Sequence, residues 1–230
     1  MIFKCFEQFN MEDNVELQFY DTFGNKHSKS MYHKEDYRYL ESGEGIVRYK
    51  FVINGIIRLN DPYALKYIRD DNGEIWSVPN TNMPIQSRNI SMNGYIGING
   101  QININEYSIS NIITNKAGQS VQKKEFVCDR PLNLYFLMNL SGVRSLHSIT
   151  VIYFQPDGRI YYLEEGGIYA DEEDCDVDII LKKRISETEM RFAEGVWQIR
   201  AFLDGRSVIK DYFILKRNII SNMVVSDYSV

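Results

Sequence analysis

The chain has 230 residues, of which 44% are hydrophobic, 13% aromatic and 25% charged, a composition typical of a globular protein with a sizeable core. The net charge of −5 argues against a nucleic-acid partner, because phosphate neutralisation needs clustered Lys and Arg and no basic run exceeds Lys182-Lys183-Arg184. No segment approaches the run of about 20 apolar residues that spans a membrane, so we expect no membrane insertion.

The amino terminus and the cysteines indicate a cytoplasmic protein. The first residues contain no basic region followed by a long apolar run, so we expect no secretory signal. Cys5, Cys128 and Cys175 are far apart, odd in number and without a Cys-x-x-Cys pair. We therefore expect reduced thiols.

Alternating apolar residues predict several short strands in the first third of the chain. Val15, Leu17 and Phe19 alternate with polar residues, and Tyr49, Phe51 and Ile53 do the same. Asn54-Gly55 follows directly and predicts a tight hairpin that ends at Asp61-Pro62. The segment 63–68 fits either a helical turn or a short strand. Further strands are expected near residues 1–10, 30–33, 37–40 and 75–78.

Residues 83–105 change in character, with repeated Asn, Gly and Ile. We expect either an interdomain linker or crossing strands, the latter as a hairpin about Asn99-Gly100.

The rest of the chain repeats the strand pattern. Gly195–Leu203 and Ser207–Leu215 flank Asp204-Gly205 and predict a second tight hairpin, with Trp197 on its core face. The likeliest short helix covers residues 187–192. Further strands are expected over residues 108–113, 122–127, 132–138, 148–154, 159–163 and 178–181.

Strands at this spacing predict an all-β protein of two tandem immunoglobulin-like β-sandwich domains. We expect the first sandwich over residues 1–82, the linker or crossing strands over 83–105, the second sandwich over 106–217 and a tail over 218–230.

The first domain resembles the early-set immunoglobulin-like domains of the glycogen-binding type, also seen in the β subunit of AMP-activated protein kinase. The resemblance lies in Val15-Glu16-Leu17, in Tyr49 to Gly55, in Asn60-Asp61-Pro62 and in Gly73. It implies an immunoglobulin-like fold and an α-glucan ligand. The second half resembles bacterial immunoglobulin-like accessory domains more loosely, through Gly195 to Gly205.

The resemblance suggests ligand residues but also shows departures. Lys50 matches a family lysine that contacts glucan, whereas Ile56-Ile57 replaces an aromatic residue on which the family stacks a sugar ring. Loss of such an aromatic platform should remove most of the affinity. The ligand-binding candidates are Lys50, Trp76, Tyr20, Phe23, Tyr63 and Tyr67.

The sequence contains no motif that fixes a reaction or a cofactor. His27, His33 and His147 lack neighbours at metal-ligand spacing, and no catalytic or phosphate-binding motif occurs. Asp174, Asp176 and Asp178 alternate and would line one face of a strand, which suits either Ca²⁺ or a solvated acidic edge.

These observations favour a non-enzymatic binding or assembly protein that acts through protein–protein contacts, with a protein partner or by self-association of edge strands. The alternative is an α-glucan-binding module. An enzyme of the glycosidase type would need two carboxylates about 5–10 Å apart in a cleft, and the sequence offers no candidate pair.

Overall fold

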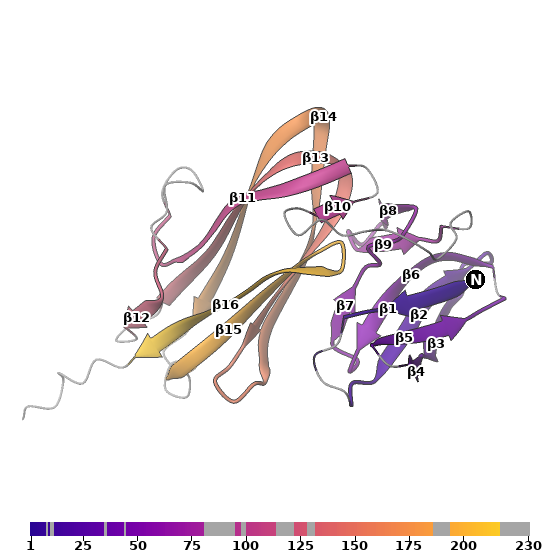
Figure 1. Cartoon of the computed structure of the whole chain (residues 1–230), viewed down its shortest axis with the longest axis horizontal. Coiled ribbons are helices and arrows are strands. Elements are labelled where there is room, and N and C mark those ends of the chain that lie inside the picture. Colours follow the sequence, from indigo (N-terminus) through magenta and orange to yellow (C-terminus); the bar gives the residue numbers. More distant parts are fainter. Residues whose placement is uncertain are drawn as a thin grey trace, which may run out of the picture.

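The computed structural model describes residues 1–7, 9, 12–34, 36–43, 45–80, 95–97, 100–113, 122–127, 132–185 and 194–216, with backbone alone at 95–97, 100–101 and 171–175. All the regular structure in these residues is β, in three sheets, which confirms the all-β prediction (Figure 1). The described part of the chain contains no helix with the length and apolar character that crossing a membrane requires.

The first half, residues 1–80, forms two sheets. One sheet has the order β1-β5-β4, and the other has the order β3-β2-β6-β9-β8 with β7 beside β6. Side chains from both sheets, such as Phe3, Leu17 and Phe51, belong to one buried cluster. The strands are β1 (Ile2–Cys5), β2 (Val15–Asp21), β3 (Lys26–Ser30), β4 (Tyr32–Lys34), β5 (Tyr37–Glu41), β6 (Ile46–Ile53), β7 (Ile57–Leu59), β8 (Lys66–Arg69) and β9 (Ile75–Val78).

The two tight hairpins predicted from the sequence are present. Asn54 and Gly55 have φ values of 52° and 70°, and Ile53 lies opposite Ile57. Asp204 and Gly205 have φ values of 53° and 80°. Two consecutive positive φ values are what a type I′ hairpin turn requires.

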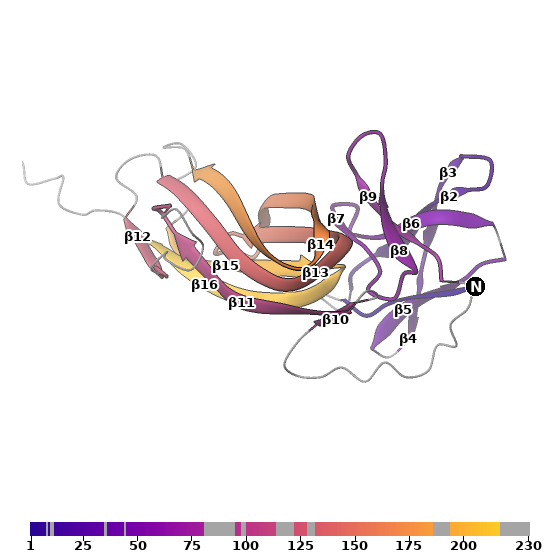
Figure 2. The same cartoon turned by 90° about the horizontal axis from the view of Figure 1, so that it is seen from above.

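The second half, residues 95–216, is one sheet in the order β10-β11-β13-β15-β16-β12, with β14 beside β13. It curves strongly along its long strands (Figure 2). The strands are β10 (Tyr95–Gly97), β11 (Gly100–Ser110), β12 (Glu125–Val127), β13 (Leu132–Phe154), β14 (Ile160–Ile185), β15 (Gly195–Leu203) and β16 (Arg206–Lys216).

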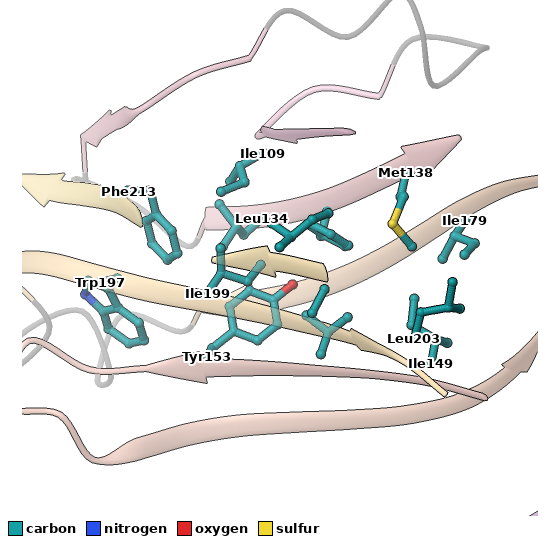
Figure 3. Packing of buried hydrophobic residues seen from close by; sticks show 14 of the residues in the cluster. Ile109, Leu134, Met138, Ile149, Tyr153, Ile179, Trp197, Ile199, Leu203 and Phe213 are labelled. Atoms are coloured by element: carbon teal, nitrogen blue, oxygen red, sulfur yellow. The ribbon is translucent and has the colours of Figure 1, made fainter. Parts of the chain in front are cut away.

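Strand β13 bends back over its own core. Its register with β14 shifts between Leu140 and Ser145, and Gly142 and Ser145 have positive φ values. Side chains on both sides of the bend, such as Met138 and Tyr153, therefore enter one buried cluster (Figure 3). Bulges and positive φ values are the usual means of bending a strand in this way. The sequence predicted two separate strands, at 132–138 and 148–154, and the structure joins them.

Other expectations have mixed outcomes. Residues 66–69 form a strand, so the strand alternative for 63–68 holds in part. Tyr95–Gly97 pairs antiparallel with the start of β11, in line with the crossing-strand alternative, but Gly100 lies in the strand opposite Gly97, so the pairing is not centred on Asn99-Gly100 as expected. The helix expected over 187–192, the tail over 218–230 and Cys128 lie outside the described residues.

The two halves share buried surface. The core cluster of the first half also contains Ile152, Phe154 and Phe202 of the second half, with Phe9 packed against them. Phe9 lies 6.0 Å from Phe154 and 5.7 Å from Phe202, measured between ring centroids. The junction between the halves is therefore part of the hydrophobic core.

Candidate functional site

A cavity of about 220 Å³ opens at the junction between the two halves. Its walls are polar and apolar in about equal measure and include Lys50 and Glu74 from the first half and Glu165 from the second. The remaining lining residues are Asn60, Asn72, Gly73, Ile75, Ser148, Ile149, Thr150 and Gly166.

Lys50 joins the two halves across this cavity. Strand β6 places Lys50 in a buried position, 1% exposed, and its Nζ donates to Glu74 Oε1 at 3.1 Å and to Glu165 Oε2 at 3.2 Å. Arg58 Nη1 donates to the same Glu74 oxygen at 2.8 Å. Two cations thus face two carboxylates, so the buried ammonium is compensated.

Glu74 and Glu165 form the carboxylate pair that the sequence did not reveal. Because both bind one ammonium, their bonded oxygens lie no further apart than the sum of the two Lys50 distances. The ion pair engages one oxygen of each carboxylate. No sequence signal links Glu74, in the β8–β9 turn, to Glu165 on β14, so distant along the chain.

A second buried polar pair, His147 and Asp204, lies within the second half, with the His147 ring 6.3 Å from the Tyr67 ring of the first half. His147 Nδ1 lies 2.7 Å from Asp204 Oδ2, and Nε2 lies 2.6 Å from the carbonyl oxygen of Arg144. Both ring nitrogens therefore face acceptors, which only the imidazolium form satisfies. Burial lowers the pKa of His147, but the hydrogen bonds and the charge of Asp204 outweigh it, so the pKa is raised above its ordinary value of 6.5.

Asp204 also fixes the β15–β16 turn against β13, next to the first half. Its Oδ1 accepts from the backbone N–H of Ser148 at 2.8 Å. The next residue, Gly205, approaches the first half so closely that a Cβ there would lie 1.7 Å from the carbonyl oxygen of Asn60. Figure 1 shows this turn on the side of the second half that faces the first. Only glycine fits both this contact and the positive φ.

Trp76 does not offer the ring face expected of a sugar platform. Its side chain is fully buried, and its Nε1 donates to Asp70 Oδ2 at 2.9 Å. The Tyr20 ring packs edge-on at 5.1 Å, and Lys50 Nζ lies 5.2 Å from the indole centroid. Burial thus corrects the expectation for Trp76, because neighbours from β2 and β6 cover the ring.

The remaining ligand candidates do not gather around the cavity. Tyr67 is buried, and its hydroxyl donates to the carbonyl oxygen of Asp61 at 2.9 Å. The Tyr63 hydroxyl accepts from Arg206 Nη2 at 3.3 Å, and Phe23 is 88% exposed in the turn after β2. Of the six candidates, Lys50 alone lines the cavity.

The alternating aspartates Asp174, Asp176 and Asp178 lie on β14. Asp176 and Asp178 are exposed, and Asp178 Oδ1 accepts from Asn139 Nδ2 at 2.7 Å. The side chain of Asp174 lies outside the described residues. Among the described side chains, no group of three His, Cys, Asp or Glu is placed to hold a metal ion.

Comparisons with known proteins give structural likeness alone. No protein-family model matches the chain, and no curated protein matches it. An immunoglobulin-like protein from Pseudomonas aeruginosa aligns over 52% of this chain and 100% of its own, at 15% identity and a TM-score of 0.34.

Two glycosidases align over smaller shares of their own length. β-Glucuronidase 2 from Bacteroides uniformis covers 92% of this chain and 25% of its own, at 10% identity and a TM-score of 0.33. β-Glucosidase from Listeria innocua covers 48% of this chain and 16% of its own, at 9% identity and a TM-score of 0.28. At these TM-scores we draw nothing about function from the alignments.

Proposed function

We propose that this chain is a non-enzymatic binding or assembly protein of the cytoplasm, built from two immunoglobulin-like domains and acting through protein–protein contacts. The observation that carries the proposal is the junction, where one buried cluster contains side chains of both halves. Such a junction makes the chain one rigid body that presents its outer strands and turns at a fixed spacing.

The charged groups at the junction support a structural role. Lys50 is held by two carboxylates, and His147 and Asp204 are buried against each other. Removing one member of such a set leaves an uncompensated charge, which makes the set costly to open for catalysis. The proposal therefore assigns Lys50 and its two carboxylates to holding the halves together, and His147 with Asp204 to fixing the turn that meets the first half, without a cofactor.

Exposed aromatic side chains supply surface suited to a protein partner. Phe23, Tyr32, Tyr169 and Tyr212 are all exposed. Tyr and Phe are enriched at protein interfaces, where they bury a large area for little conformational entropy. Because the chain is acidic overall, we propose a protein rather than a nucleic acid as partner.

Co-purification tests the proposal. The tagged full chain is recovered from its native cells, and bound proteins are identified and quantified by mass spectrometry. We expect one protein, or untagged copies of this chain, to be recovered at a stoichiometric ratio. At least one of four variants should recover less of that partner: Phe23→Ser, Tyr32→Ser, Tyr169→Ser or Tyr212→Ser. Lys210→Ser on exposed β16 is the control. Recovery of the tagged chain alone contradicts the proposal.

An α-glucan-binding module is the second candidate, and the cavity at the junction favours it. Lys50, Asn60 and Thr150 line that cavity, and side chains of these types bind sugar hydroxyls. The test is titration with maltooligosaccharides and a pull-down on glycogen, with Glu165→Gln as the cavity variant. Binding that this variant weakens supports the candidate, and no binding at millimolar concentration refutes it.

A further inference from the structure

Strand β14 has a long edge without a partner strand. It spans Ile160–Ile185 and, within the described part of the chain, pairs only with β13. Figure 2 shows its carboxyl end at the margin of the curved sheet. An unpaired edge presents a row of backbone N–H and C=O groups to which another strand can pair.

The carboxyl end of this edge carries an ordered charge pattern on its outer face. The outward side chains are exposed, and those between them are buried or half-buried against the sheet's inner face. Along the strand, the outer face carries two acidic residues, then one apolar residue, then two basic residues. We call this set the β14 charge ladder: Asp176, Asp178, Ile180, Lys182 and Arg184.

The β14 charge ladder is complementary to itself when two copies run antiparallel. With a two-fold axis at Ile180, Asp178 of each copy lies opposite Lys182 of the other, and Asp176 lies opposite Arg184. Ile180, 45% exposed, then meets its own copy. Opposite charges across two strands stabilise the pairing, and like charges destabilise it.

Other arrangements of the same two strands are worse. A parallel pairing in register places each charge opposite an identical charge. An antiparallel shift by two residues in either direction places Ile180 opposite a charged residue, and the shift that sets Asp178 opposite Arg184 keeps only half of the four opposite-charge pairs. The pattern therefore specifies the antiparallel orientation, and the contact of Ile180 with its own copy favours the centred register.

We propose that two copies of this chain form a two-fold symmetric dimer by antiparallel pairing of their β14 edges, centred on Ile180. The inference rests on the proposed assembly function and names a partner for it, a second copy of the chain. Backbone hydrogen bonds between the strands supply attraction, and the charge ladder sets the register, because exposed ion pairs alone contribute little.

Contacts within one copy are compatible with this pairing. Asp178 uses one carboxylate oxygen for Asn139 and keeps the other. The Lys182 ammonium lies 5.9 Å from the Tyr135 ring centroid, and this contact leaves its N–H donors available. Both side chains can thus reach across to a second strand.

Charge exchange tests the dimer. Sedimentation equilibrium of the full chain measures its molar mass against concentration. We expect a dimer for the wild type, and a dissociation constant raised roughly tenfold or more for Asp176→Lys/Asp178→Lys and for Lys182→Asp/Arg184→Asp, because all four pairs become repulsive. An equimolar mixture of these two variants should form a heterodimer with four opposite-charge pairs, and a chain carrying all four changes should dimerise again.

Controls separate this result from nonspecific effects of charge. Lys66→Asp/Lys210→Asp, on β8 and β16, makes the same change in net charge as Lys182→Asp/Arg184→Asp and should leave the dimer intact. If a double variant fails to fold, Ile180→Lys places two ammonium groups face to face at the axis and should also give monomers.

Three outcomes overturn the proposal: a monomeric wild type throughout the concentration range, no association in the mixture of variants, or equal loss in the control. Its failure is distinguishable from failure of the proposed function. A monomeric wild type that still recovers a stoichiometric cellular protein refutes the dimer and leaves the assembly function standing.

Discussion

Substitution of Gly205 tests whether the junction is closed as tightly as the structure indicates. The Cβ of Gly205→Ala would lie 1.7 Å from the carbonyl oxygen of Asn60, and the residue has a φ of +80°. The backbone of one half or the other must therefore move. Gly158 is the matched control, with a φ of +83° and nothing within 4 Å of an added Cβ.

Both substitutions place an alanine in the left-handed backbone region, and only Gly205→Ala also creates a steric clash. An alanine in the left-handed region costs about 1–2 kcal/mol at either site. At Gly205 the clash with Asn60 adds a further cost of about 1–3 kcal/mol, typical of overpacking. We therefore expect Gly158→Ala to lower the free energy of unfolding by about 1–2 kcal/mol and Gly205→Ala to lower it by about 2–5 kcal/mol.

Urea denaturation followed by circular dichroism measures both variants under one set of conditions. The difference between their midpoints isolates the contact between the halves, since the backbone cost cancels. Equal losses of stability for the two variants would refute the close approach of Gly205 to Asn60, and with it our account of the junction.

Three further predictions concern buried groups. The pKa of His147 is raised in the folded state, so its stabilising contribution is complete below its ordinary value of 6.5 and is lost as pH rises through the folded value. The free energy of unfolding should fall over that range in urea titrations, and the fall should be absent in His147→Gln; a fall of equal size in that variant contradicts the assignment. Lys50→Met should lower the free energy of unfolding by about 1–3 kcal/mol, because it leaves two carboxylates without their shared cation. Lys210→Met, at an exposed site, should lower it by under about 0.5 kcal/mol. Equal losses for the two variants would contradict a stabilising role for the Lys50 ion pairs. Burial raises the pKa of Cys5 to about 12, so peptide mapping should find Cys5 unalkylated by iodoacetamide at pH 8 until the protein unfolds, and rapid modification of the native protein would contradict its burial.

Local features of the fold are readable from the sequence. Asn54-Gly55 and Asp204-Gly205 adopt the positive φ values that their hairpins require, because few other residue pairs tolerate them. The alternation in β2 matches its buried pattern of Val15, Leu17 and Phe19. These features depend on near neighbours, which a single sequence displays.

Features that depend on how distant segments pack were missed. Ile75, Trp76 and Ser77 are all buried, so β9 lacks the alternation that would have placed Trp76 in the core. The carboxylates that meet Lys50 come from separate halves, and nothing in the sequence near Glu74 points to Glu165. The bend in β13 likewise depends on a core that its two ends enclose together.

Native-state hydrogen exchange on the wild-type chain tests most directly the claim that the two halves form one rigid unit. The amides that exchange slowest in β6 and in β15 should give the same free energy of opening, equal to that of global unfolding. In Gly205→Ala both values should fall together. Different values for the two strands in the wild type, with a fall confined to β15 in the variant, would show that the halves unfold independently and would contradict the account.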